Sequence, residues 1–221
     1  MDEPVEEVKW SRNSVEVDTA SRGRHRARCA IITLPLGVLR EDTVRFTPPL
    51  PRRKQVAIHD LGCGKVVKVF VRVDSFREGV RYALSNCAVP VWWPRQVGRH
   101  SVLVGWASGQ SADRLSDELP VDVKCRAAQS VGAIFPRLLP VRFDDIHVVD
   151  WFTEEFSRGG YSYTPTGCDG DARRTDLAAP EGGTLLFAGE ATDRVYYSTV
   201  TGAARSGRRA AQEALGILRL T

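Results

Sequence analysis

The stretch that most constrains the fold lies near the C-terminus, between residues 184 and 211. Residues 185–187 form a short apolar run that ends at Gly189, as a buried strand does. A polar and aromatic turn follows, and helical spacing begins at Thr199. The helix carries small and apolar residues at intervals of three and four, namely Val200, Ala203, Ala204, Gly207, Ala210, Ala211 and Ala214. We therefore predict a strand, a turn and a helix that packs closely against a sheet or a ligand.

This strand–turn–helix unit is equipped to hold a polar ligand. Glu190 follows the strand, and its carboxylate can accept hydrogen bonds from hydroxyl groups. The free N–H groups of the first helical turn, near Thr199 and Val200, favour an electron-rich oxygen. From the pattern alone, the alternative is an ordinary βα unit with a surface glutamate, because such units are common.

Composition and charge exclude several classes of protein. The chain has 221 residues, of which 43% are hydrophobic and 26% charged, as in soluble globular proteins. No apolar run approaches the roughly 20 residues that cross a bilayer, and residues 1–7 are too acidic for a secretory signal. The net charge of +4 is spread without a basic tract. We therefore expect neither a membrane nor a nucleic acid as partner.

The cysteines and histidines give no sign of a disulfide framework or a metal site. The five cysteines are scattered, and none forms a Cys-x-x-Cys pair. Their odd number favours reduced thiols in an intracellular protein. The four histidines are equally dispersed, so a metal site is not expected. We expect a cytoplasmic location, with a peroxisomal or nuclear one left open.

Alternating and periodic patterns predict the other elements. Residues 5–10 and 15–17 alternate as in a β-hairpin, and the continuously apolar part of 26–34 suits a strand buried on both faces. Helices are expected at 52–61 and 121–135. Further strands are expected at 65–73, 81–84, 91–93, 101–106 and 144–150.

Two segments combine this secondary structure with chemically notable side chains. Lys68 shares one face of its predicted strand with Val66, Phe70 and Arg72, and the pattern alone favours a solvated strand lysine. The segment 151–163 clusters aromatic residues around a pair of glycines. Clustered aromatics are usually core or interface residues, although neighbouring glycines allow a flat ring system to approach.

Three motifs resemble those of the flavin-containing amine oxidases. The first is Phe187-Ala-Gly-Glu-Ala-Thr through Tyr-Tyr-Ser-Thr-Val-x-Gly-Ala, which is most similar to the version in animal spermine and acetylpolyamine oxidases. The second is Leu61-Gly-Cys-Gly-x-x-x-Lys68-Val-x-Val-x-Val. The third is Trp151-x4-Phe156-x-x-Gly-x-Tyr161-Ser. Ile32-Thr-Leu-Pro-Leu-Gly-Val-Leu, followed by Phe46-Thr-Pro-Pro-Leu-Pro, is also similar to this family.

The resemblance implies a role for each matching residue. Glu190 would bind the ribityl hydroxyls of FAD, and the Val200 N–H would stabilise negative charge near flavin O2. Lys68 would be the catalytic lysine that holds a water against flavin N5, with Lys65 as its non-catalytic neighbour. The remaining expected contacts are Trp151 and Phe156 against the flavin, Tyr161 facing the substrate amine, and Thr199 beside both ring and substrate.

The resemblance also implies an architecture. We expect an α+β fold with part of the FAD-binding domain at residues 1–48, a mixed-sheet substrate domain at 49–160, and the C-terminal part of the FAD-binding domain at 161–221. Two features depart from the family. No Gly-x-Gly-x-x-Gly loop for the pyrophosphate occurs in the sequence, and Thr201 stands where relatives commonly carry histidine.

Three functions remain open. As the resemblance implies, an FAD-dependent polyamine oxidase would move hydride from spermine, spermidine or an acetylated form to flavin N5. An aldehyde and a shorter amine would follow, with oxygen reduced to hydrogen peroxide. The missing loop motivates an alternative, a non-catalytic fragment or interaction module of the same family. A relative of the histone lysine demethylases is the third possibility, which the Tyr196-Tyr197-Ser-Thr motif disfavours.

Overall fold

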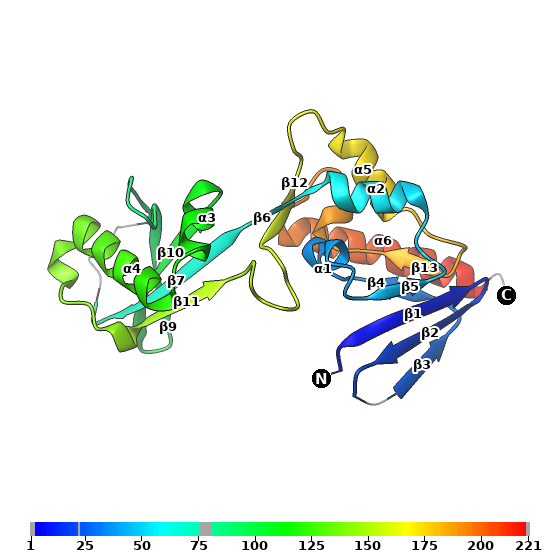
Figure 1. Cartoon of the computed structure of the whole chain (residues 1–221), viewed down its shortest axis with the longest axis horizontal. Helices are drawn as coiled ribbons and strands as arrows, with labels where there is room; N and C mark the ends of the chain where they lie inside the picture. The colour runs from blue at the N-terminus through cyan, green and yellow to red at the C-terminus, as the bar shows by residue number, and fades with distance from the viewer. Residues whose placement is uncertain (1–2, 22, 76–80, 220–221) are drawn as a thin grey trace. The chain divides into compact units, whose positions relative to one another are not determined.

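Short apolar runs in this chain build two structural units, each with its own hydrophobic core. The computed structural model describes residues 3–21, 23–75 and 81–219. It divides into unit 1, Met1–Cys63 with Glu155–Thr221, and unit 2, Gly64–Glu154. Each unit is described by itself below, with the element labels of Figure 1.

Unit 1 contains a small outer sheet at its N-terminal end. Its strands lie in the order β3-β2-β1-β5, with β1 parallel to β5 and antiparallel to β2. The alternation of the hairpin sends Val8 and Val15 into the core, while charged residues stay outside. The strands are β1 (Val5–Ser11), β2 (Ser14–Thr19), β3 (Gly23–Ala27) and β5 (Arg45–Thr47).

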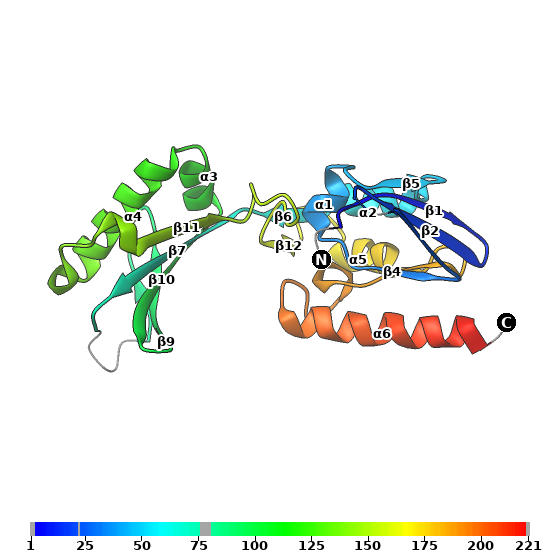
Figure 2. The same ribbon diagram turned by 90° about the horizontal axis from the view of Figure 1, so that it is seen from below.

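The centre of unit 1 is a parallel strand pair covered on both faces. β13 (Leu185–Phe187) pairs with β4 (Ala30–Ile32). Leu185 and Phe187 enter the main core, whereas Leu186 packs with Ala210 of α6 (Val200–Arg219) on the other face. Successive side chains of a strand point to opposite faces, so the apolar run 185–187 needs a cover on each side. Figure 2 shows α6 running beneath this pair.

Helices supply the other cover of the parallel pair. They are α1 (Leu36–Arg40), α2 (Arg52–Asp60) and α5 (Gly170–Ala178). Lys54 of α2 is fully buried, and its ammonium donates to the carbonyl oxygens of Asp176, Leu177 and Ala179 at 3.0, 2.8 and 2.7 Å. Because the last carbonyls of a helix have no partner within it, Lys54 satisfies the C-terminal end of α5.

Three short elements complete unit 1. β12 (Tyr161–Tyr163) pairs with β6 (Gly62–Gly64), and the 3-10 helix η3 (Glu190–Thr192) directly follows β13. Gly62 lies under the ring of Tyr163, where a Cβ atom would come within 2.3 Å of the ring. A glycine is therefore required at this crossing.

Unit 2 is one antiparallel sheet with helices on one face. The strand order is β11-β7-β10-β9-β8. Val67, Val69 and Val71 of β7 form its core with Val123 and Val131 of α4. Figure 2 shows α3 and α4 on the same side of this sheet. The elements are β7 (Val66–Val73), β8 (Ala83–Leu84), β9 (Val91–Val97), β10 (His100–Ser108), α3 (Gln110–Ser116), α4 (Pro120–Ile134), η1 (Pro136–Leu138), η2 (Phe143–Asp145) and β11 (Ile146–Asp150).

The predicted α+β fold class is confirmed, while several details were wrong. The segment 26–34 is not one strand, because β3 ends at Ala27, β4 covers Ala30–Ile32 and Ile31 is exposed. The helix at 200–219 is present, but its buried residues are Gly202, Ser206 and Ala210, so the predicted stripe is rotated. Helices α1, α3 and α5 were not predicted from the sequence.

The predicted domain boundaries also differ from the observed units. Residues 49–160 were expected as the middle domain, yet α2 packs against α5 and belongs to unit 1. The middle unit therefore begins at Gly64 and ends at Glu154. The outermost residues of the predicted terminal segments, 1–2 and 220–221, lie outside the described residues.

Candidate functional site

Glu190 lies at the carboxyl end of β13, where η3 begins, and three protein donors hold its carboxylate. The backbone N–H of Ser162 donates to Oε1 at 2.9 Å, and the Ser162 hydroxyl donates to Oε2 at 2.7 Å. The backbone N–H of Ser198 also donates to Oε2. An ionised carboxylate has about four acceptor positions, so at least one stays free for a ligand hydroxyl.

The turn between Glu190 and α6 is shaped by a second carboxylate. Asp193 accepts from the backbone N–H groups of Val195 and Tyr196 at 2.9 and 2.7 Å, and from Arg205 at 3.1 Å. Burial raises the pKa of Asp193, but these N–H donors and the Arg205 guanidinium outweigh it, and the pKa lies below its usual value. The ionised side chain therefore fixes the path of the turn.

The N-terminal end of α6 follows this turn and is accessible to a ligand. Ser198 adopts a φ of 61°, and the Thr199 hydroxyl caps the helix by accepting from the Gly202 N–H at 3.0 Å. The Val200 side chain is 87% exposed, and its backbone N–H has no hydrogen-bond partner among the described residues. The partial positive charge of a 20-residue helix is thus available to a ligand oxygen.

Arg174 of α5 joins this group, although the sequence pattern did not single it out. Its side chain is 1% exposed, and its guanidinium donates to the Ser162 hydroxyl at 2.8 Å and to the Ala191 carbonyl at 3.1 Å. The guanidinium carbon lies 3.8 Å from the centroid of the Tyr197 ring. Burial lowers the pKa of Arg174, while the Glu190 charge opposes this effect.

Two other predicted flavin or substrate contacts lie in unit 1. Tyr161 is half-buried on β12, next to Ser162 in the sequence. Phe156 is 62% exposed. Their predicted roles toward the ring and the amine stay predictions.

Lys68 and Trp151 lie in unit 2. Lys68 is half-buried on the face of β7 that turns away from the valine core, and it pairs across strands with Trp106 and Val149. Its ammonium forms no hydrogen bond or ion pair with any residue that the structure describes, whereas Lys65 lies 3.4 Å from Asp113. Trp151 is half-buried, and its backbone N–H donates to the Val66 carbonyl at 3.0 Å.

Aromatic rings accompany Lys68 on this face of the sheet. Trp93 and Trp106 meet edge to face with their centroids 6.4 Å apart, and Tyr82 lies 6.1 Å from Trp93. The buried Trp106 Nε1 has no acceptor among the described residues. Aromatic faces attract cations, so this surface suits an amine better than an anion.

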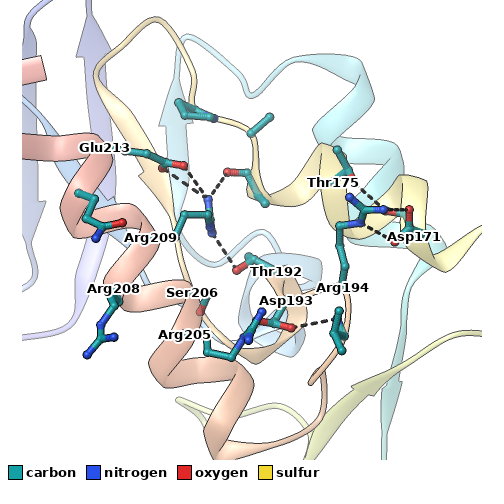
Figure 3. Close-up of a pocket in the computed structure, with 15 residues that line it drawn as sticks. Asp171, Thr175, Thr192, Asp193, Arg194, Arg205, Ser206, Arg208, Arg209 and Glu213 are labelled. Carbon is teal, nitrogen blue, oxygen red and sulfur yellow. Dashed lines mark hydrogen bonds and ion pairs between the residues drawn. The ribbon is translucent and has the colours of Figure 1, made fainter. Parts of the chain in front are cut away.

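A pocket of about 870 Å³ lies elsewhere in unit 1, between α5 and α6 (Figure 3). Four arginines line it, but acidic side chains pair three of them. Arg194 pairs with Asp171, Arg205 with Asp193 and Arg209 with Glu213. The positive charge of three of its four arginines is therefore balanced by carboxylates. Neither Glu190 nor Arg174 lines this pocket.

The donor set around Glu190 suits an organic cofactor better than a metal ion. In the described part of the chain no group of three or more His, Cys, Asp or Glu could hold a metal, and all five thiols are free. A carboxylate with a spare acceptor position and an unpartnered helix N-terminus fit a group that has hydroxyls and an electron-rich oxygen. These features define an α/β unit that is equipped to bind an organic cofactor, and the chain also contains a β-sheet unit that carries a lysine.

Comparison with known proteins identifies the family. Residues 1–215 match the model of the flavin containing amine oxidoreductases. The chain therefore belongs to this family, and the flavin cofactor predicted from the sequence motifs is confirmed at the family level. No helix within the described ranges is long and apolar enough to span a membrane.

Relatives of two kinds match along nearly the whole chain. Lysine-specific histone demethylase 1 homolog 1 of Arabidopsis thaliana is 31% identical over 98% of this chain and 26% of its own length. Polyamine oxidase 3 of Oryza sativa subsp. japonica is 33% identical over 95% of this chain and 44% of its own length. The identities are too close to distinguish the two kinds, and the chain spans less than half of either relative.

Solved structures share the fold. Cyclohexylamine oxidase from Brevibacterium oxydans IH-35A superimposes with a TM-score of 0.80 at 22% identity, covering 97% of this chain and 48% of its own. Wild-type putrescine oxidase bound to putrescine gives 0.83 at 24% identity, covering 97% of this chain and 49% of its own. These likenesses support the predicted architecture.

Proposed function

We propose that the chain is the flavin- and amine-handling part of an FAD-dependent polyamine oxidase. The observation that carries this proposal is the Glu190 carboxylate, held by three donors beside the open N-terminus of α6. The same turn carries the Tyr196-Tyr197-Ser-Thr motif. Membership of the amine oxidoreductase family supports the reaction class.

The residues of unit 1 would bind and orient the cofactor. Glu190 would accept from the ribityl hydroxyls through its free acceptor position. The Val200 N–H would donate to a ring oxygen that gains negative charge on reduction. Thr199 and Phe156 would contact the ring, and Tyr161 would face the substrate amine.

The residues of unit 2 would handle the amine. When bound, the flavin supplies the acceptor for the hydride that leaves the carbon next to the amine nitrogen. Lys68 would orient a water or help a proton to leave the amine, because its ammonium has no other partner in the described part of the chain. Trp151 would complete the ring contacts.

Peroxide release from spermine tests this proposal. With flavin present, Lys68→Met should lower turnover by about a hundredfold, the low end of what a positioned acid or base contributes. Lys65→Met is the matched control, because the Lys65 ammonium forms an ion pair with Asp113. This variant should keep turnover within about twofold of the wild type. Undiminished turnover of Lys68→Met would remove this lysine from the mechanism.

A histone lysine demethylase is the second candidate, because relatives of that name match this chain at similar identity. The same peroxide assay separates the two substrates when spermine, acetylated spermine and a dimethyl-lysine peptide are compared. We expect turnover with a polyamine and none with the peptide. A preparation that takes up no flavin would instead favour a non-catalytic module.

A further inference from the structure

Arg174 is a buried cation that none of the sequence motifs explains. Its side chain is 1% exposed, yet its guanidinium contacts no carboxylate directly within the described residues. A buried charge is costly unless hydrogen bonds and neighbouring charges compensate it. The position of Arg174 therefore needs a reason beyond packing.

The partners of Arg174 either bind Glu190 or are next to it or to its second partner in the chain. Ser162 belongs to β12, Ala191 directly follows Glu190, and Tyr197 directly precedes Ser198. Ser162 and Ser198 are the residues whose N–H groups hold the Glu190 carboxylate. One guanidinium thus joins the start of the turn, its end and the strand beside it.

The contact with Ser162 also sets the direction of a hydrogen bond. A hydroxyl has one proton and can rotate between partners. Because Arg174 donates to Ser162 Oγ at 2.8 Å, the Ser162 proton is left to point at Glu190 Oε2, 2.7 Å away. The Ser162 hydroxyl therefore links the Arg174 guanidinium to the Glu190 carboxylate by two consecutive hydrogen bonds.

We propose that Arg174 is the positioning residue of the cofactor site: it clamps the turn 190–198 at both ends and holds the Glu190 carboxylate in place for a flavin. This inference rests on the proposed function, which assigns Glu190 to the cofactor. Nη1 of Arg174 donates to both Ser162 and Ala191, and the planar guanidinium lies over the Tyr197 ring at the same time. A lysine at this position would keep the charge but lose the planar contact with the Tyr197 ring, so the clamp would be weakened.

Amide hydrogen exchange, resolved by residue with NMR, tests this clamp in the full chain without added flavin. In Arg174→Met, the amides of Ser162 and Ser198 should exchange at least about tenfold faster than in the wild type, since a hydrogen bond to a charged group is lost or loosened. Arg174→Lys should give an intermediate increase, and it serves as the readable variant if Arg174→Met does not fold. Arg173→Met is the matched control from the same helix, because Arg173 pairs with Asp60 and Asp176 instead and should leave both amides unchanged.

A flavin titration of the same proteins separates the clamp from the proposed function. The Kd for FAD, followed by the flavin absorbance spectrum, should rise about tenfold in Arg174→Met and stay within about twofold in Arg173→Met. Wild-type exchange rates at Ser162 and Ser198 in both Arg174 variants would overturn the clamp. Accelerated exchange in a chain that takes up no FAD would support the clamp and contradict the proposed function.

Discussion

At the scale of single residues, buried charges organise unit 1. The Lys54 ammonium caps the C-terminal end of α5 by donating to three carbonyls. Its Nζ lies 3.8 Å from the centroid of the Phe187 ring. Glu181, itself buried, lies 3.4 Å from Lys54 and pairs with Arg53. The buried ammonium of Lys54 thus links the end of α5 to the Phe187 ring of β13.

Removing the Lys54 ammonium should destabilise unit 1. We expect Lys54→Met to lower the free energy of unfolding by about 2–4 kcal/mol, because buried carbonyls lose their donor. Chemical denaturation measures this change. Arg52→Met, at an exposed position of the same helix, should stay within about 0.5 kcal/mol. Equal stability of both variants would contradict the role given to Lys54.

Lys54 also predicts a pH dependence. Burial lowers its pKa from 10.5 to about 8, with Glu181 opposing this effect. Between these pH values the unfolded chain binds the proton and the folded chain does not, so stability rises with pH across this window. The difference in unfolding free energy between wild type and Lys54→Met should therefore grow by up to about 3 kcal/mol from pH 8 to 10.5. A difference that stays flat would show that Lys54 keeps its proton when folded.

The sequence identified some of these residues and missed others. Glu190, Thr199 and Val200 stand in a motif, and their local order in the chain predicts a strand end and a helix start. Arg174 and Ser162 come together only because α5 and β12 meet at η3. Such a contact between distant segments leaves no periodic signal in the sequence.

At the scale of elements, α6 depends on close approach at its first turn. A Cβ atom on Gly202 would lie 2.1 Å from the Tyr196 carbonyl oxygen, whereas one on Gly216 would meet nothing within 4 Å. The sequence predicted the helix from its spacing, but it could not predict which face is buried, since alanines and glycines occur all around it.

These two glycines give a matched pair of predictions. Gly202→Ala should cost about 2 kcal/mol or more, because the backbone of the turn must shift. Gly216→Ala should gain about 0.5–1 kcal/mol from reduced backbone freedom in the unfolded chain. Thermal or urea unfolding of the two variants checks the signs, and a stabilising Gly202→Ala would mean that the turn lies farther from α6.

At the scale of the whole molecule, the chain joins a discontinuous unit to a continuous one. The alternating valines of β7 predicted the strand of unit 2 with few errors, because one covered face imposes a period of two. The boundary was harder to predict. The helix α2 reads like any amphipathic helix, and only its contact with α5 assigns it to unit 1.

Unit 2 should fold by itself. Among the described residues, its core is built from the segment Gly64–Glu154 alone and includes Trp92, Leu103 and Val131. We expect a peptide of residues 64–154 to unfold cooperatively on heating, with the circular dichroism of a mixed sheet and helix protein. A gradual, non-cooperative melt would show that its core needs unit 1.

The central claim, that Glu190 and the start of α6 hold a flavin, is tested most directly by titrating the purified chain with FAD. We predict saturation at about one flavin per chain, a Kd at least about tenfold higher in Glu190→Gln, and a change within about twofold in Glu213→Gln, whose carboxylate pairs with Arg209 instead. A chain that binds no FAD, or that binds it equally well without the Glu190 charge, would contradict the account.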